Sequence, residues 1–379
     1  MMNFVLFTAS TYSHIANFHR PYLRAFHELG WKVHVACGGT PMSIPEADEV
    51  IPLPFEKQMS SPANFRAQKQ LREAMNRYHY TLVCTHTSLA AFFTRRAAAG
   101  LNTSRPPVVN VVHGYLFHKQ TPPIKKAILL TAEKMTAPQT DLLLTMNQWD
   151  HDAALRHHLG RVTVNIPGIG VDFSRFLPVS WEQRLDLRES LGYGGNDFVL
   201  IYAAEFSARK NQAMLIHALP ELPQRVKLLL PGQGALLEPC RSLARRLGVD
   251  NRICFPGQLS DMPRWYGAVD AAVSSSRSEG LPFNIMEAMY CGLPVVASAV
   301  KGHTDLIQDG GNGLLYPCND PHAFARQVSV LLGDPGYCTS MGGAAQTNIA
   351  PYALETVLPQ VMQAYLSIVK EAALPLLTH

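Results

Sequence analysis

The sequence predicts an α/β protein built from two doubly wound, Rossmann-like domains with parallel sheets, and three observations lead to this prediction. Short, continuously apolar segments alternate with amphipathic helical segments, which is typical of parallel sheets covered by helices on both faces. This series runs through residue 147 and starts again after residue 177. With 379 residues, the chain has the length of two ordinary domains.

The first series predicts an N-terminal domain at residues 1–170. Its first strand, NFVLFTAS, is followed by a helix near residues 17–29, which Gly30 ends. Further buried strands are predicted for WKVHVAC, TLVCT, PVVNVVH and DLLLTMN.

The second series predicts a C-terminal domain at residues 171–356, with strands FVLIYAAE, KLLLPG, RICFPG, AAVSSS and PVVAS. The segment NIPGIGVDFSRFLP, residues 165–178, contains proline and glycine and is predicted to be the interdomain linker. A C-terminal helix at about residues 357–379 is expected to pack back on the first domain. The two domains should face each other across a cleft, and ligands should bind at the carboxyl ends of the strands.

Composition excludes several classes of protein. Apolar residues make up 47% of the chain and charged residues only 16%, so it is globular rather than disordered. No segment approaches the roughly 18–20 apolar residues of a membrane-spanning helix. MMNFVLFTAS lacks the basic flank and cleavage pattern of a signal peptide and is predicted to be a strand. Seven cysteines without a CxxC pair favour reduced thiols in a cytoplasmic chain over a disulfide framework or a zinc site.

Positive charge is concentrated in one part of the chain. The net charge is +4, but residues 57–134 contain 12 Lys and Arg against 2 Asp and Glu. Such a block attracts an anionic surface or a phosphorylated partner, and the alternative is a solvated basic face. No nucleic-acid-binding motif accompanies it, so no nucleic acid partner is expected.

Two glutamates in SRSEGLPFNIMEAMYCGLPVVAS, residues 276–298, lie around a predicted helix start. Glu279 precedes the helix, Pro282 is its expected first residue, and Glu287 lies a turn and a half inside. The free amides of residues 283–285 should point into the cleft and, with the helix dipole, favour anionic or hydroxyl oxygens. Two carboxylates beside such a site suit a nucleotide sugar, because a carboxylate accepts hydrogen bonds from vicinal hydroxyls. The alternative is that Glu279 only places a favourable charge near a helix start and that Glu287 is a surface residue.

Several motifs resemble those of one family. EGLPFNIMEAM followed by CGLPVVAS resembles the E-x7-E signature of the retaining glycosyltransferases of family four, which have the GT-B fold. IPGIGVDFSRF is similar to that family's interdomain segment, and KGHTDLIQDGGNGLLYP to the segment after its E-x7-E strand. SHIANFHRPYL and HGYLFHK resemble its N-domain loops, in the branch that builds lipid-linked O-antigens, capsules and exopolysaccharides. The resemblance covers nearly the whole chain.

The resemblance implies that the C-terminal domain binds the nucleotide-sugar donor. Glu287 should hold the ribose 2′ and 3′ hydroxyls, and Glu279 should hold the hydroxyls of the transferred sugar. Asn284 stands where many members have glycine, and we expect its amide to contact the sugar or the diphosphate. Further contacts are expected from the backbone of Gly280, Leu281, Phe283 and Ile285.

The donor diphosphate needs positive charge, because departure of the leaving group from C1 loads its oxygens. Lys210, in AAEFSARKNQ, matches the family's phosphate lysine. The family's companion arginine falls on Glu205, so either Arg209 supplies the second charge or one cation suffices. A purely structural basic pair at a helix start is the alternative.

Histidines of the N-terminal domain are further candidates. His113, followed by Gly114 at the end of strand PVVNVVH, matches the family histidine that approaches the donor sugar and phosphate. His14 matches the loop that closes over the donor, and His86 ranks behind both. Because 11 of the 15 histidines precede residue 170, a histidine can easily fall at such a position by chance. A structural role is therefore the alternative for each of them. His113, Glu279 and Lys210 are the predicted catalytic residues, and His14 and Gly114 are predicted donor contacts.

No metal and no cofactor are expected. Asp150-His151-Asp152 imitates the D-x-D metal motif of other glycosyltransferases, but acidic residues there favour a helix start. The GT-B fold does not require a metal for donor binding. Gly232-x-Gly234 lacks the third glycine of a dinucleotide fingerprint. No carboxylate is placed as a nucleophile, so front-face attack with retention is expected, with the protein orienting the reactants and stabilising charge.

The resemblance also implies that the N-terminal domain binds the acceptor. The segment HGYLFHKQTPPIKKAILLTAEKM mixes apolar residues with four lysines and is suited to an anionic bilayer surface. It would present the domain to a polyprenyl-diphosphate-linked sugar or another saccharide, and an ordinary packed helix is the alternative. We therefore expect a hexosyltransferase at the inner face of the cell membrane, using a UDP-linked hexose or N-acetylhexosamine. A nucleotide-sugar epimerase of the same fold and a non-enzymatic sugar-binding protein are the rival functions.

Overall fold

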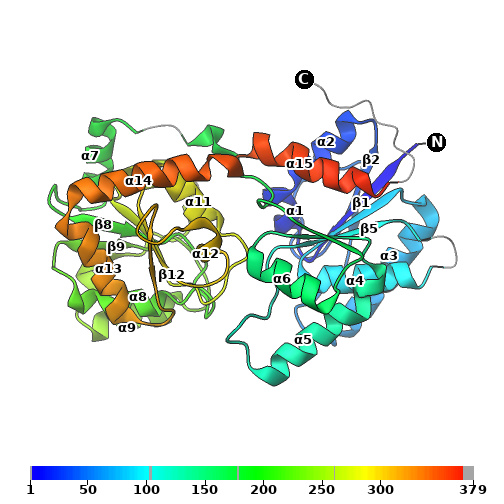
Figure 1. The fold of residues 1–379 in the computed structure, drawn as a ribbon, viewed down its shortest axis with the longest axis horizontal. Coiled ribbons are helices and arrows are strands. Elements are labelled where there is room, and N and C mark those ends of the chain that lie inside the picture. The colour runs from blue at the N-terminus through cyan, green and yellow to red at the C-terminus, as the bar shows by residue number, and fades with distance from the viewer. Residues whose placement is uncertain (1, 102–104, 177–178, 260, 370–379) are drawn as a thin grey trace. The chain divides into compact units, whose positions relative to one another are not determined.

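The computed structural model describes residues 2–101, 105–176, 179–259 and 261–369, and it divides into two compact units. Unit 1 comprises the chain up to Gly170 together with the residues from Glu355 onward, and unit 2 comprises Val171–Leu354. Each unit is a parallel sheet with helices packed on both of its faces (Figure 1). The α/β, doubly wound fold predicted from the sequence is therefore confirmed.

In the described part of unit 1, the strands form one sheet in the order β3-β2-β1-β4-β5-β6-β7, and all neighbouring pairs are parallel. The strands are β1 Phe4–Ala9, β2 Lys32–Cys37, β3 Glu49–Pro52, β4 Leu82–His86, β5 Val108–Val112, β6 Leu142–Thr145 and β7 Val162–Asn165. The helices are α1 Tyr12–Phe18, α2 Arg20–Glu28, α3 Pro62–Tyr78, α4 Ser88–Ala99, α5 Pro123–Thr136, α6 Gln148–His157 and α15 Leu354–Ser367.

Alternate residues of β1 enter the cores on the two faces of this sheet. Leu6 lies in the core that α3 and α4 cover. On the other face, Phe7 contacts Phe26 of α2 and Tyr365 of α15, with ring centroids 5.8 and 6.2 Å apart. Because both faces are buried, β1 is apolar except for Thr8 and was recognisable from the sequence.

Unit 2 repeats this arrangement, with its described strands in the order β10-β9-β8-β11-β12-β13. The strands are β8 Phe198–Ile201, β9 Val226–Leu229, β10 Ile253–Cys254, β11 Ala271–Ser274, β12 Val295–Ser298 and β13 Leu314–Tyr316. The helices are α7 Trp181–Ser190, α8 Gln212–Ala218, α9 Leu237–Arg246, α10 Met262–Ala268, α11 Phe283–Tyr290, α12 His303–Leu306, α13 Pro321–Gly333 and α14 Pro335–Ile349.

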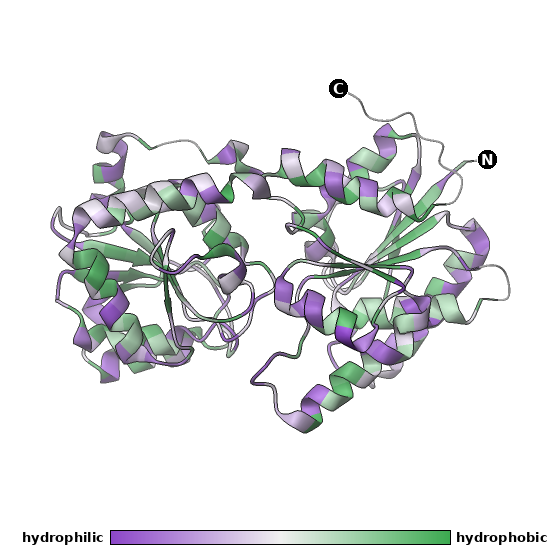
Figure 2. Ribbon diagram, in the orientation of Figure 1, coloured by the Kyte–Doolittle hydropathy of each residue, from purple (hydrophilic) through white to green (hydrophobic). Residues whose placement is uncertain are grey.

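Two apolar cores flank the sheet of unit 2. Leu200 and its neighbours pack against α8, α9 and α13, whereas Ile201 packs on the opposite face against α10, α11 and α14. In Figure 2 hydrophobic residues predominate in the central strands, while hydrophilic residues lie along the covering helices. Among the described residues, no helix has both the length and the apolar character needed to cross a bilayer.

The structure differs from the predicted elements in two respects. The helix expected at residues 17–29 is two helices that meet at His19, because Pro21 has no amide hydrogen with which to continue the hydrogen bonds of α1. Strands β3, β7 and β13 were not predicted. All three lie at sheet edges, where a strand is short or partly exposed and lacks a continuous apolar run.

Parts of two predicted segments lie outside the described residues. They are residues 177–178 of the expected linker and residues 370–379 of the expected C-terminal helix.

Candidate functional site

The predicted site residues of unit 2 follow β8 and β11, which are neighbours in the middle of its sheet. From β8 the chain continues to β9 and β10 on one side, and from β11 to β12 and β13 on the other. Ligands of doubly wound sheets bind at the carboxyl ends of the strands beside such a reversal of strand order. Arg209 and Lys210 lie in the loop after β8, and Glu279 lies in the loop after β11.

Glu279 connects these two loops through ion pairs. Its Oε1 lies 2.6 Å from Lys210 Nζ, and its Oε2 lies 2.6 Å from Arg209 Nη1. The side chains of Glu279 and Lys210 are 7% and 12% exposed, whereas that of Arg209 is 50% exposed. Burial opposes ionisation of Glu279, but the two cations outweigh it and lower its pKa from 4.5 to about 2. An ionised carboxylate therefore lies between two cations, which leaves the group with a net positive charge.

Buried hydroxyl groups hold this arrangement in place. Ser276 Oγ donates to Glu279 Oε1, and the hydroxyls of Tyr202 and Ser276 share a hydrogen bond of 2.7 Å. Ser275 Oγ donates to the backbone carbonyl of Lys210 at 2.9 Å. The two serines that follow β11 therefore join the two loops, a role that the sequence analysis did not recognise.

Glu205, which stands in place of the family's arginine, acts on this group through its negative charge, which opposes the lowering of the Lys210 pKa by burial. Its side chain is exposed, and its backbone carbonyl accepts a hydrogen bond from Gln212 Nε2 at 2.9 Å. Arg209 thus provides the second cation at Glu279.

Glu287 lies in α11, which begins at Phe283 with Pro282 as its N-cap, one residue later than predicted. The partly buried Glu287 Oε2 accepts a hydrogen bond from Tyr266 OH of α10 at 3.2 Å. Burial raises the pKa of Glu287 from 4.5 to about 7, and the hydrogen bond from Tyr266 opposes this shift. The two glutamates of the motif therefore have opposite pKa shifts.

The prediction for Ile285 is wrong. Its amide donates to the Pro282 carbonyl at 3.1 Å, because the chain tightens at the start of α11. Its side chain is 1% exposed and belongs to the core beneath the helix. Neither group is available to a ligand.

The other predicted residues of this segment surround Glu279 and α11. Gly280 is buried, and Leu281 and Phe283 pack partly against the core. The backbone carbonyl of Asn284 accepts a second contact from Tyr266 OH, at 3.1 Å.

Two residues after β12 also contact the Glu279 loop, and sequence reasoning had assigned them no role. Gly302 has a φ of +83°, and a Cβ there would lie 2.7 Å from the Gly280 carbonyl oxygen. His303 is fully buried, and its Nδ1 lies 2.8 Å from the Ser298 carbonyl oxygen. In the sequence, the glycine before the histidine in KGHTD could have indicated this position. KGHTD belongs to the segment that resembles the one after the family's E-x7-E strand.

Gly232 has a structural role. Its φ is +144°, and a Cβ would lie 2.0 Å from the carbonyl oxygen of Ala204. Glycine therefore lets the loop after β9 lie directly against the loop that leads to Lys210.

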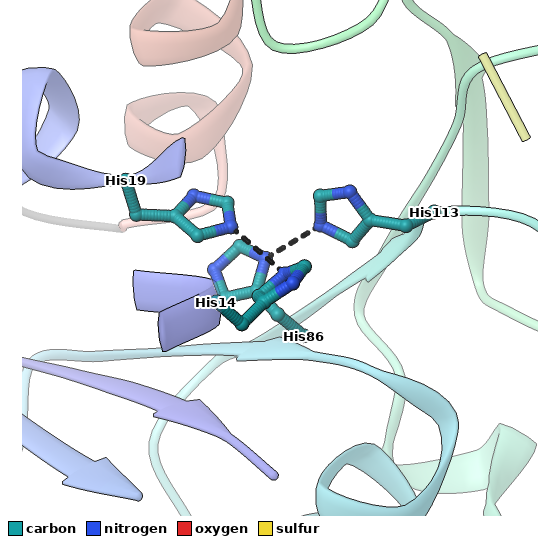
Figure 3. A group of neighbouring side chains, drawn as sticks. All are labelled: His14, His19, His86 and His113. Carbon is teal, nitrogen blue, oxygen red and sulfur yellow. Dashed lines mark hydrogen bonds between the residues drawn. The ribbon is translucent and has the colours of Figure 1, made fainter. Parts of the chain in front are cut away.

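In unit 1, four histidines gather at the carboxyl ends of the neighbouring strands β1, β4 and β5 (Figure 3). His14 lies in α1 after β1, His86 ends β4, and His113 directly follows β5. His19, at the junction of α1 and α2, completes the group and was not predicted. The nearest nitrogens of His14 and His19 are 3.2 Å apart, as are those of His86 and His113.

This histidine cluster is electrically neutral at neutral pH. Burial lowers the pKa of His14 to about 4. Burial and the neighbouring rings hold the pKa values of His19, His86 and His113 well below 6.5. Gly114, the predicted neighbour of His113, has a φ of +115°, which favours glycine.

Asp150 and Asp152 are engaged separately. Asp150 is fully buried, and its Oδ2 accepts hydrogen bonds from Asn147 Nδ2 and from the amide of Tyr115, at 2.7 and 3.2 Å. Asp152 accepts from Gln148 Nε2 at 2.7 Å. Asn147, not an aspartate, is the N-cap of α6.

Comparisons with known proteins cover both units. The family model described as "Glycosyl transferases group 1" matches residues 183–348, and the one described as "Glycosyltransferase Family 4" matches residues 22–173. The protein named "Putative glycosyltransferase EpsD" of Bacillus subtilis is 35% identical over 343 residues, which cover 89% of this chain and 90% of that protein. A protein of Mycolicibacterium smegmatis, named as a GDP-mannose-dependent alpha-(1-6)-phosphatidylinositol monomannoside mannosyltransferase, is 33% identical over 189 residues. That match covers 47% of this chain and 49% of the relative.

Solved structures are similar along nearly the whole chain. Anabaena HepE in complex with UDP and glucose has a TM-score of 0.79 at 21% identity, covering 97% of this chain and 100% of that one. Sucrose-phosphate synthase from Thermosynechococcus elongatus has a TM-score of 0.81 at 21% identity, covering 96% and 98%.

Proposed function

The chain belongs to the family 4 glycosyltransferases and has the GT-B fold, and on this premise we propose that it transfers a hexose or N-acetylhexosamine from a nucleotide sugar to a lipid-linked saccharide. The proposed donor is UDP-linked, and the transfer would serve cell-surface polysaccharide synthesis at the inner face of the membrane. The UDP and glucose bound to HepE support this donor class, while the mannosyltransferase relative makes GDP-mannose the competing donor.

The observation that best supports the proposal is the arrangement of Glu279 between Lys210 and Arg209. The two cations would bind the donor diphosphate, beside the start of α11 and its positive helix dipole. Hydrogen bonds from charged groups contribute about 1.5–3 kcal/mol each. Glu279, held ionised by its partners, would accept hydrogen bonds from the hydroxyls of the transferred sugar. Gly280, Leu281, Phe283 and Asn284 would provide the neighbouring contacts.

Glu287 is proposed to accept the two ribose hydroxyls of the nucleotide. Only its ionised form offers acceptor positions on both oxygens. Because its pKa is about 7, donor affinity should rise as the pH increases through neutrality.

We expect retention by front-face attack. Both oxygens of Glu279 are engaged by Lys210, Arg209 and Ser276, so this carboxylate is not free to attack the sugar. The bond from C1 to the diphosphate oxygen breaks as the bond from C1 to the acceptor oxygen forms. A phosphate oxygen of the leaving group takes the acceptor proton. Positive charge at the diphosphate comes from the chain's own cations, so donor binding would require no metal ion.

His113 remains the proposed catalytic residue of unit 1, with His14 and Gly114 as donor contacts. Nε2 of His113 faces His86, which leaves Nδ1 as the nitrogen that can donate to a substrate oxygen.

The acceptor is proposed to reach unit 1 at a membrane surface formed by α5 and the segment before it. Of the described residues of α5, only Thr136 is buried, while Leu129 and Leu130 pack partly against the core beneath the helix. Glu133 is paired with Arg95 at 2.8 Å, which leaves the lysines to dominate the charge of the helix. The exposed apolar residues are Leu116, Ile124, Ile128 and Met135, and the lysines are Lys119, Lys125, Lys126 and Lys134.

The test is transfer with defined substrates. The purified chain is incubated with UDP-glucose, UDP-galactose, UDP-N-acetylglucosamine or GDP-mannose, with and without polyprenyl-diphosphate-linked saccharides. The proposal expects UDP release that depends on the acceptor and a product with the anomeric configuration of the donor by NMR. Sugar interconversion without acceptor would instead indicate an epimerase, and an inverted product would refute front-face retention.

A further inference from the structure

The histidine cluster of unit 1, formed by His14, His19, His86 and His113, has the geometry of a metal site. One ring nitrogen from each residue lies within 4.8 Å of the other three, and Figure 3 shows the rings converging on one point. Hydrogen bonds explain two of these contacts, between His14 and His19 and between His86 and His113. They do not explain why the two pairs meet.

The distances match a tetrahedral ion. Zinc binds histidine nitrogen at about 2.0–2.1 Å, which places tetrahedral ligands about 3.3–3.4 Å apart. The nitrogens of His14 and His19 are 3.2 Å apart, and so are those of His86 and His113. The remaining pairs lie within 4.8 Å and would approach this separation on binding an ion.

Two ring nitrogens on the outer side of the cluster have no hydrogen-bond partner in the described part of the chain. His19 Nδ1 and His86 Nε2 are buried and have no hydrogen-bond partner among the described residues. A buried polar atom without a partner destabilises a fold by about 1–3 kcal/mol. The contacts of these two rings are made by their other nitrogens, His19 Nε2 and His86 Nδ1, which face His14 and His113.

The residue types select the class of ion. Four imidazoles with no carboxylate among them suit zinc and the neighbouring late transition metals, whereas Mg²⁺ and Ca²⁺ require oxygen ligands. The neutral imidazole is also the form that binds a metal.

We propose that His14, His19, His86 and His113 form a tetrahedral site for Zn²⁺ or a similar divalent transition metal. The site belongs to unit 1, whereas the proposed donor cations Lys210 and Arg209 belong to unit 2.

Such an ion would also fix which ring nitrogen of His113 carries the proton. The catalytic importance of this effect rests on the proposed function. A metal bound to Nε2 leaves the proton on Nδ1, so His113 becomes a permanent hydrogen-bond donor at that nitrogen. The ion would act as a positioning element for a proposed catalytic residue.

The test measures metal binding without reference to activity. The full chain, stripped with a chelator, is dialysed against Zn²⁺ and analysed by metal mass spectrometry, alongside His19→Gln and His86→Gln. His217→Gln, at an exposed histidine of α8, is the matched control. We expect one Zn²⁺ per chain in the wild type and in the control. Each cluster variant should lose more than the roughly 10–100-fold of affinity that removal of a supporting residue costs.

A second measurement keeps the proposal testable if the variants fold poorly. Co²⁺ added to the stripped wild type should give the intense visible absorption of a tetrahedral ion. Weak octahedral absorption, no stoichiometric Zn²⁺, or equal Zn²⁺ binding by folded His86→Gln and His217→Gln would each overturn the metal site. If the wild type binds Zn²⁺ as expected but transfers no sugar to an acceptor, the metal site stands and the proposed function is contradicted.

Discussion

Replacing Glu287 by glutamine removes a carboxyl group that the fold keeps partly protonated, and the effect on stability should depend on pH. The pKa of Glu287 is about 7 in the folded protein, against an ordinary value of 4.5. Between these values the folded state binds more protons than the unfolded state. Stability from this group is therefore fully present below pH 4.5 and is lost as the pH rises through 7.

The magnitude follows from the shift. At about 1.36 kcal/mol per pKa unit, ionised Glu287 destabilises the fold by about 3 kcal/mol at pH 8. About 2 kcal/mol of this arises between pH 5 and pH 7. Glutamine keeps an oxygen that can accept from Tyr266 but has no charge to bury. The variant should therefore gain stability over the wild type by these amounts, while losing donor affinity.

The assay is equilibrium urea unfolding at pH 5, 6, 7 and 8, with hydrogen exchange on peptides of unit 2 so that the free energy refers to this unit. Glu279→Gln is the matched control, and its expected effect on the free energy of unfolding has the opposite sign. Its pKa of about 2 means that ionised Glu279 stabilises the fold above pH 4.5, and this contribution is lost as the pH falls towards 2. Discounted for the half-exposed Arg209, Glu279→Gln should cost about 2 kcal/mol at pH 7.

Equal effects of the two substitutions at pH 8 would refute the reasoning. A stability difference between the wild type and Glu287→Gln that does not change from pH 5 to pH 8 would refute it as well, because the shifted pKa requires that change.

Three further predictions test other parts of the account. Tyr266→Phe removes a hydrogen bond that lowers the pKa of Glu287, so the midpoint of donor affinity against pH should move upward; an unchanged midpoint in titrations with UDP would contradict this. Gly302→Ala should lower the melting temperature more than Gly257→Ala, because both have positive φ but only Gly302 meets backbone, at 2.7 Å; equal losses in differential scanning calorimetry would exclude the close contact as the cause. Lys125→Glu with Lys126→Glu should abolish flotation with anionic liposomes at low salt, since each lysine near such a surface contributes about 1 kcal/mol; binding that survives would exclude the α5 surface.

The sequence predicted the interior strands well because their signal is local. Strand β1 is buried on both faces and is apolar except for Thr8, whereas β3 and β7 are edge strands whose exposed residues break that pattern. The break at His19 depended on the single proline that follows it.

The sequence named candidate residues for both sites, but it did not predict the contacts between them. Lys210 and Glu279 are 69 residues apart and meet because β8 and β11 are neighbours, which follows from strand order rather than from any motif. The raised pKa of Glu287 depends on its burial beside Tyr266 of another helix. Similarly, His19 joins the cluster only because three strands end at the same edge of the sheet. Ile285 was wrongly predicted because the sequence does not show that the first turn of α11 tightens onto Pro282.

The most direct test of the central claim is calorimetric titration of UDP into the wild type, Lys210→Met, Glu287→Ala and Lys69→Met. Lys69 is an exposed lysine of α3, 80% accessible, and controls for the loss of a positive charge. If the loops after β8 and β11 bind the donor, Lys210→Met and Glu287→Ala should each weaken UDP binding by about 10–100-fold, the equivalent of about 1.5–3 kcal/mol. Lys69→Met should bind like the wild type. Binding of equal strength by all four proteins would contradict the account.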